Sequence, residues 1–264
     1  MTSLGRPQIH HVVDGDAADP PVLLVNGLGT TLEVWDRVVP GLSEEGRVVR
    51  YDLRGHGRTP ATPGPYTIAE LAADALAVLD AVGVERAHVV GTSLGGMVAQ
   101  WLASNVPDRV ARLVLICTAA RLGEPDFWRQ RADLALREGA AATSAAVVPR
   151  WFTPGFREQH PDQVARVVDM LAGCDMAGYA GCCLAIGAYD QREDLGTIAA
   201  PTLVIGGAED PAISSALLAE LAAGIPDADL EVVPGGAHLL AVEHPDTVRR
   251  LISTHLHAQK EGQP

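Results

Sequence analysis

Hydrophobic positions along the chain fall into two kinds of run. Short apolar runs bounded by turn residues predict buried strands, because a parallel strand covered on both faces needs apolar side chains on both. Longer stretches with apolar residues three and four positions apart predict helices. One such stretch, 67–83, ends at Gly83, as expected of a helix C-cap. Six strands are expected, at 20–27, 46–52, 87–91, 112–118, 201–207 and 229–235.

This alternation is typical of an α/β fold, with a parallel sheet flanked by helices. Between 122 and 194 it stops, because helical segments follow one another there without a convincing strand. We therefore interpret residues 1–121 and 195–264 as one core, and residues 122–194 as an inserted, mostly helical cap over the end of the sheet. The alternative is a second, unrelated domain, but neither an internal repeat nor a low-complexity linker supports it.

Composition narrows the classes of partner and compartment. The chain has 264 residues, 47% of them hydrophobic, which is enough for a large core. A net charge of −13 disfavours nucleic acid and anionic membranes as partners. The first 20 residues lack a basic region followed by an apolar run, and no apolar stretch reaches about 18 residues, so we expect a cytoplasmic protein. A small-molecule substrate is the expected partner, and assembly into a homo-oligomer is left open.

Cysteine and histidine spacing gives no sign of a metal site. The four cysteines have no C-x-x-C spacing, and the nine histidines form no cluster with zinc spacing. Reduced, buried thiols are therefore expected, and neither a metal nor another cofactor is predicted.

The stretch "GTSLGG", residues 91–96, contains the pattern G-x-S-x-G. Chance alone places this pattern in roughly one chain in ten of this length, so its context decides its meaning. An apolar run leads directly into it and a helical stretch follows, which is the strand, turn and helix arrangement that exposes a nucleophilic serine. Ser93 is then the candidate nucleophile, and the N–H of Leu94 lies at a helix N-terminus, where it can stabilise an oxyanion. The alternative is a small residue in a tight turn.

A nucleophilic serine needs a base, and the base needs a partner that orients it. Asp210 and His238 each follow one of the last two predicted strands, so both are expected at the same edge of the sheet as Ser93. Taken singly, Asp210 could be a turn or capping residue and His238 a loop histidine. Their order and placement favour a Ser-His-Asp triad. His244 is the weaker candidate base, because Pro245 after it suits the start of a helix.

Two glycine-containing loops follow the early strands. Gly27 and Gly29 let the backbone of the "NGLG" turn approach a substrate, so the N–H of Leu28 is the second candidate oxyanion donor, unless this is a simple glycine turn. In "YDLRGHG" we interpret Asp52 as a structural residue that bonds local backbone amides.

The motifs "NGLG", "YDLRGHG", "GTSLGG", "GGAEDP" and "GGAHL" together resemble the α/β-hydrolase fold across nearly the whole chain. In the cap, "VVPRWFTPGF" and "GYAGCCLAI" are similar to 3-oxoadipate enol-lactonases of aromatic-acid catabolism. This resemblance implies hydrolysis of an enol-lactone to 3-oxoadipate without a cofactor. Ser93 would attack the carbonyl, His238 would move the proton and Asp210 would orient the imidazolium. The family pattern has serine where this chain has Gly27, so a hydroxyl is missing there.

Alternatives to lactone hydrolysis stay open. They are another reaction of the same triad (an esterase, a carbon–carbon bond hydrolase or a tailoring enzyme of secondary metabolism) or a non-catalytic ligand-binding member of the fold. The presence of all three triad residues disfavours the last.

An anionic substrate in an acidic protein needs local basic groups. Arg121 and Arg150 are the candidates for holding its carboxylate. Trp128 and Trp151 are candidates for lining the lactone site. For each of these four residues, packing in the cap or exposure to solvent is the alternative.

Overall fold

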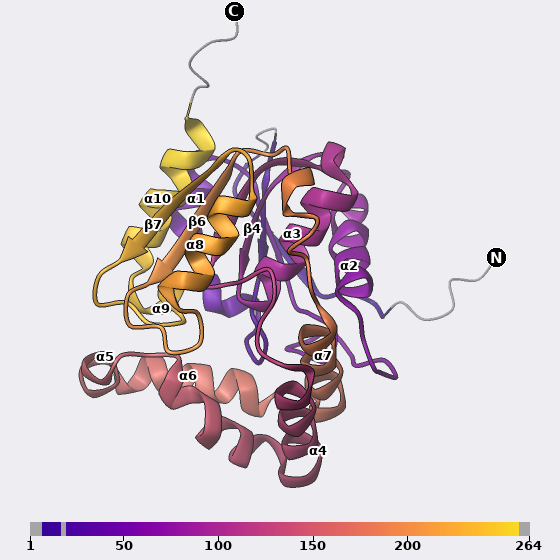
Figure 1. Cartoon of the computed structure of the whole chain (residues 1–264), viewed down its shortest axis with the longest axis vertical. Helices are drawn as coiled ribbons and strands as arrows, with labels where there is room; N and C mark the ends of the chain where they lie inside the picture. Colours follow the sequence, from indigo (N-terminus) through magenta and orange to yellow (C-terminus); the bar gives the residue numbers. More distant parts are fainter. Residues whose placement is uncertain (1–6, 17–19, 259–264) are drawn as a thin grey trace, which may run out of the picture.

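The computed structural model describes residues 7–16 and 20–258. Within them, seven strands form one sheet in the order β1-β3-β2-β4-β5-β6-β7 (Figure 1). All neighbouring strands run parallel except β1 and β3. The six predicted strands are confirmed as β2 (Val22–Val25), β3 (Val48–Tyr51), β4 (Ala87–Thr92), β5 (Val110–Ile116), β6 (Thr202–Gly207) and β7 (Ala228–Val233).

The edge strand β1 (His11–Asp14) was not predicted. It has only four residues, and two valines are its whole apolar content. It pairs antiparallel with β3, and none of its side chains is fully buried. A half-buried edge strand therefore lacks the apolar run by which the central strands were found.

Helices flank the sheet and cover its apolar faces (Figure 1). The predicted helix 67–83 is α2 (Ile68–Ala81), which begins with a capping box between Thr67 and Glu70. The other helices of the core are α1 (Val39–Glu45), α3 (Leu94–Asn105), α8 (Ser215–Gly224), α9 (Leu240–Glu243) and α10 (Pro245–His257). Short 3-10 helices lie at η1 (Leu32–Trp35), η2 (Pro107–Arg109), η3 (Val148–Arg150) and η4 (Leu195–Thr197).

The segment predicted as a helical cap lies at one end of the sheet (Figure 1). It contains α4 (Pro125–Val147), α5 (Pro154–Gln159), α6 (Pro161–Ala172) and α7 (Met176–Ala188), and α4 packs along α7. Gly139 has a φ of 77° and breaks α4 into two helical pieces. A single hydrophobic cluster runs from the sheet into these helices. The division into core and cap stays an interpretation.

Two further expectations concern cysteines and membrane segments. The four cysteines are buried and unbridged, as predicted. In the described part of the chain, no single helix is long and apolar enough to cross a membrane, although α6 and α7 would pass together by length and composition, with a 95° bend between them. Residues 1–6 and 17–19, part of the stretch in which no leader is predicted, lie outside the described residues.

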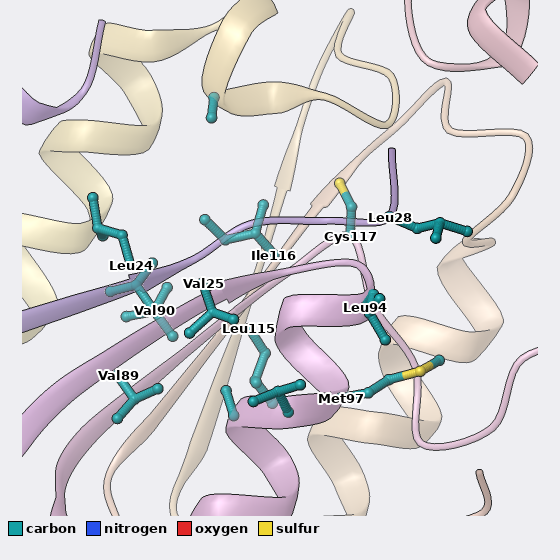
Figure 2. Close-up of a cluster of buried hydrophobic side chains, with 14 of the residues drawn as sticks. Leu24, Val25, Leu28, Val89, Val90, Leu94, Met97, Leu115, Ile116 and Cys117 are labelled. Atoms are coloured by element: carbon teal, nitrogen blue, oxygen red, sulfur yellow. The ribbon is translucent and has the colours of Figure 1, made fainter. Parts of the chain in front are cut away.

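The centre of the core lies between β2, β4, β5 and helix α3. Figure 2 shows Leu24, Val90 and Ile116 from the three strands packed together, with Leu94 and Met97 extending from α3. All five side chains are at most 1% exposed. Burying such a side chain stabilises the fold by about 1.5–3 kcal/mol. The ends of these strands and the start of α3 are therefore held by fully buried apolar side chains.

A buried ion pair joins the loop after β3 to α2. The guanidinium of Arg54 donates two hydrogen bonds to the Asp74 carboxylate, at 2.7 and 2.8 Å. The two side chains are 5% and 1% exposed. Removing either partner would leave an uncompensated charge in the interior.

We predict that Asp74→Ala lowers the free energy of unfolding by about 3–5 kcal/mol, because it leaves the buried charge of Arg54 without a partner. Asp80→Ala is the matched control: Asp80, 64% exposed, pairs with Arg109 near the end of the same helix. Its loss is expected to cost less than about 1 kcal/mol. Urea unfolding of both variants measures the difference. Equal losses would contradict a structural role for the buried pair.

Candidate active site

Ser93 lies in a sharp turn between β4 and α3. Its φ of 52° and ψ of −116° are strained for a residue with a side chain. A Cβ atom on Gly91 would lie 2.2 Å from the carbonyl oxygen of Gly95, and one on Gly95 would lie 2.2 Å from that of Val25. Both positions therefore require glycine, which is the residue that the G-x-S-x-G pattern has at each of them.

The structure brings the three candidate catalytic side chains into one hydrogen-bonded chain. His238 Nε2 lies 3.1 Å from Ser93 Oγ, and His238 Nδ1 lies 2.7 Å from Asp210 Oδ2. The carboxylate can only accept, so Nδ1–H donates to it and Nε2 is left to accept the serine proton. Asp210 and His238 are buried, whereas Ser93 is half-buried and faces a cavity.

The Asp210 carboxylate is stabilised in its charged form. Burial alone would raise its pKa, but the charge and hydrogen bond of His238 oppose burial, as do backbone N–H bonds from Ala212 and Ile213 at 2.8 and 3.1 Å. Together they hold the pKa of Asp210 below its ordinary value of 3.8. The group is therefore an anion near neutral pH, able to stabilise an imidazolium on His238.

His244 is not part of this arrangement. Its Nε2 lies 2.9 Å from the carbonyl oxygen of Gly235, and the residue is the N-cap of α10. The helix start predicted there is confirmed.

Cys117 lies close to two of the three candidate catalytic residues. Its Sγ atom, a carboxylate oxygen of Asp210 and a ring nitrogen of His238 all lie within 4.8 Å of one another. Burial raises the pKa of the Cys117 thiol well above its ordinary value. The Sγ atom lies 3.6 Å from the carbonyl oxygen of Ala237, and His238 Nδ1 is already hydrogen-bonded to Asp210.

The two candidate oxyanion donors belong to two turns close to Ser93. Leu94 is the first residue of α3, where backbone N–H groups have no partner within the helix. Leu28 lies in the turn after β2, and within the described residues its N–H donates to no protein acceptor. Thr30 holds this turn by donating from its N–H and hydroxyl to the carbonyl oxygen of Gly27.

The side chain of His56 holds the turn after β2 through a hydrogen bond to Gly29. Its Nε2 accepts the N–H of Gly29 at 2.9 Å, and its Nδ1–H donates to the carbonyl oxygen of Arg54 at 3.1 Å. Burial lowers the pKa of His56, which keeps the ring neutral, as acceptance by Nε2 requires. In the sequence, His56 is one residue of the motif "YDLRGHG", and no separate role is predicted for it.

Asp52 has the structural role that its motif predicts. Its two carboxylate oxygens accept backbone N–H bonds from Leu32 and Arg58, each at 2.9 Å. His10 Nδ1 lies 2.8 Å from Oδ2. The carboxylate thus ties η1, its own loop and the residue before β1 together.

A cavity of about 360 Å³ opens above Ser93. Both predicted tryptophans, Trp128 and Trp151, line it, and Arg150 lines it from an exposed position. The core contributes Gly27, Leu28, Ser93, Ala212, Leu217, His238 and Leu239, and the cap contributes Leu122, Gly123, Phe127, Trp128, Arg131, Val147, Arg150, Trp151 and Ile186. No acidic residue is among these lining residues of the described chain.

Arg121 does not line this cavity. Its guanidinium bonds Glu124 at 2.9 Å and lies 3.8 Å from Asp190, beside a separate depression. Neighbouring carboxylates compensate its charge, so the structure does not place Arg121 where it could hold a substrate of Ser93.

Arg131 lines the cavity but was missed in the sequence. Its Nε donates to the Tyr179 hydroxyl at 2.8 Å, and its guanidinium lies 5.2 Å from the centre of the Trp128 ring. The spacing between Trp128 and Arg131 could have revealed it. Residues three apart on a helix share a face, and Trp128 was already a candidate for lining the site.

Comparison with known proteins identifies the family. A model of the α/β-hydrolase fold matches residues 20–245, and the chain belongs to this family. It is 35% identical to 3-oxoadipate enol-lactonase 2 of Acinetobacter baylyi over 92% of this chain and 91% of the relative. It is also 36% identical to a protein of Variovorax paradoxus named as a carbamate hydrolase, RutD, over 89% and 90%. The crystal structure of an enol-lactonase from Burkholderia xenovorans superposes with a TM-score of 0.93 at 38% identity, covering 96% of this chain and 97% of the other. The chain is therefore an ester-cleaving hydrolase by family.

We predict that stability falls as the pH decreases from 7 to 5. Below the ordinary histidine pKa of 6.5, the unfolded chain takes up a proton at His56 that burial excludes from the folded state. The variant His56→Gln has both a donor and an acceptor for these two hydrogen bonds but does not titrate. Its free energy of unfolding should change less steeply with pH than that of wild type, by up to about 1.4 kcal/mol per pH unit. Urea unfolding at several pH values measures it.

His88→Gln provides a comparison for this slope. Burial and nearby cationic groups lower the pKa of His88 to about 4. The contribution of His88 to the pH dependence of stability should therefore continue until the pH falls to about 4. Parallel curves for wild type and His56→Gln would show that the folded protein admits the proton.

Proposed function

We propose that the protein is a serine hydrolase that opens 3-oxoadipate enol-lactone to 3-oxoadipate through an acyl-enzyme. The hydrogen-bonded chain Asp210–His238–Ser93 carries the proposal. The similarity to two proteins named as enol-lactonases supports the substrate class. The apolar cavity above Ser93 has the size of a small-molecule site.

Acylation begins with attack of Ser93 Oγ on the lactone carbonyl carbon, while His238 Nε2 accepts the serine proton. The negative charge that develops on the carbonyl oxygen is stabilised by the N–H groups of Leu28 and Leu94. Cleavage of the ring C–O bond releases an enol oxygen, which receives the proton from His238. The enol remains attached to the acyl group, because the leaving group and the acyl group belong to one ring.

Deacylation uses the same residues in the reverse direction. His238 accepts a proton from water, the resulting hydroxide attacks the acyl carbon, and Ser93 leaves with the proton returned by His238. The enol converts to its ketone, giving the 3-oxo acid. Asp210 stays ionised and stabilises the imidazolium in both half-reactions.

Arg131 and Arg150 favour a substrate that carries a carboxylate. The protein has a net charge of −13, yet both charged side chains among the cavity-lining residues of the described chain are arginines. Within the described residues Arg150 has no protein partner, whereas Arg131 is oriented by Tyr179 and Trp128. An oriented guanidinium binds a carboxylate with less loss of side-chain entropy than a free one. We therefore assign carboxylate recognition first to Arg131, with the tryptophan rings packing on the lactone.

We predict that Ser93→Ala loses several orders of magnitude in kcat on the enol-lactone, while its thermal melt stays cooperative. The panel should also contain simple aryl esters, other lactones and a carbamate, because a relative is named as a carbamate hydrolase. Full turnover by Ser93→Ala would overturn the nucleophile. Rapid ester or carbamate cleavage with negligible enol-lactone turnover would overturn the substrate.

We predict that Arg131→Gln raises KM for the enol-lactone about 10- to 100-fold, as expected for loss of a hydrogen bond to a charged group. KM for a neutral aryl ester should change little. Arg129→Gln is the matched control, because Arg129 is 58% exposed on the same helix and pairs with Asp126. Equal losses on charged and neutral substrates would show that Arg131 only supports packing.

A further inference from the structure

Glu243 is a buried carboxylate at the end of α9 that does not line the cavity. One oxygen, Oε2, accepts the N–H of Ala237 at 2.8 Å. The other, Oε1, accepts the N–H of Thr153 at 3.0 Å and also the Thr153 hydroxyl. Within the described residues no arginine, lysine or histidine pairs with it. A buried carboxyl group without a counter-ion needs hydrogen-bond donors, and these three donors hold Glu243 in place.

These hydrogen bonds join the cap to the loop that carries the candidate base. Ala237 immediately precedes His238, and Glu243 links it to Thr153 in the cap segment between η3 and α5. Leu239 immediately follows His238, and its N–H donates to the carbonyl oxygen of Trp151 at 3.0 Å. The residues on both sides of His238 are therefore tied to the same three-residue cap segment, 151–153.

Trp151 gives this connection a link to the substrate site. Its side chain lines the cavity above Ser93, while its carbonyl oxygen holds the backbone of Leu239. A ligand that fills the cavity contacts the segment that fixes the His238 loop. The cap thus both closes the cavity and takes part in orienting the base.

We propose that Glu243 is a positioning residue that couples the cap to His238, an inference that rests on the proposed hydrolase function. His238 must keep two hydrogen bonds at once, 2.7 Å to Asp210 and 3.1 Å to Ser93. A misplacement of about 1 Å in a catalytic group can cost roughly 100-fold in rate. Because Glu243 does not line the cavity, losing its charge should affect kcat and leave KM nearly unchanged.

Glu243→Gln tests the proposal with almost no change in volume. The glutamine NH₂ group cannot accept a hydrogen bond, so it must face either Ala237 or Thr153, and the backbone N–H on that side loses its acceptor. We expect kcat to fall about 10- to 100-fold, with KM within about twofold of wild type. Phosphonylation of Ser93 by a fluorophosphonate should slow by the same factor. The low-field proton resonance of His238 Nδ1–H should broaden or shift.

Thr153 provides a second, independent set of variants. Thr153→Val removes the hydroxyl at nearly constant volume, and Thr153→Ser, which restores it, should recover most of the lost kcat. Because the Thr153 hydroxyl also caps α5, Thr67→Val is the matched control: it removes the corresponding cap of α2, a core helix. Thr67→Val should lower the melting temperature without changing the His238 resonance.

Three outcomes would overturn the proposal: unchanged kcat and an unchanged His238 resonance in Glu243→Gln, a loss that appears mainly in KM, or the same loss of kcat in Thr67→Val. Failure of the proposed function gives a different result: a wrong substrate would leave wild type reactive with the fluorophosphonate but inactive on the enol-lactone, and a wrong nucleophile would abolish both reactions of wild type. The His238 resonance reports on Glu243 in either case.

Discussion

A serine with a φ of 52° costs the folded chain about 1–3 kcal/mol, and it persists only where the surroundings leave no other conformation. Here the N–H of Ser93 donates to Ile116 on β5, and its carbonyl oxygen accepts the hydroxyl of Thr118 at 2.8 Å. Gly91 and Gly95 allow two pieces of backbone to approach more closely than any side chain would permit. The position of Ser93, the candidate nucleophile, is thus fixed by the central strands, and the remaining groups of the candidate site are arranged around it.

The groups around Ser93 come from loops that leave the same end of the parallel sheet. Asp210 follows β6 and His238 follows β7, whereas the turn containing Leu28 follows β2. Buried polar side chains secure these loops: His56 and Asp52 below the early loops, and Glu243 beside the last one. These three buried side chains therefore help to position the loops that carry the candidate catalytic groups.

The sequence predicted the features that leave a local signal. Central strands appear as continuous apolar runs, and the turn at Ser93 requires glycines at fixed positions. β1 was not predicted, because a half-buried strand of four residues has no such apolar run. The role of Glu243 was not predicted, because its partner Thr153 is 90 residues away in the sequence. An acidic residue near the end of a helix is also too common to indicate such a role.

The sequence alone could not show which arginine of the cap lies where it can bind a substrate carboxylate. Arg121 and Arg131 differ in whether a carboxylate or a phenol lies beside them, which spacing does not reveal. Gly27 is different again, since a Cβ there would lie 3.4 Å from that of Ser93, an ordinary contact, so space alone does not require glycine.

The break at Gly139 has a consequence for how specificity can change. Residues 125–138 form one piece of α4 that carries Phe127, Trp128 and Arg131 and is joined to α7 through Tyr179. The piece after the break contributes Val147 to the cavity wall. The piece before the break thus supplies three of the side chains that line the cavity, and substitutions there can reshape the cavity wall without altering the sheet that positions Ser93.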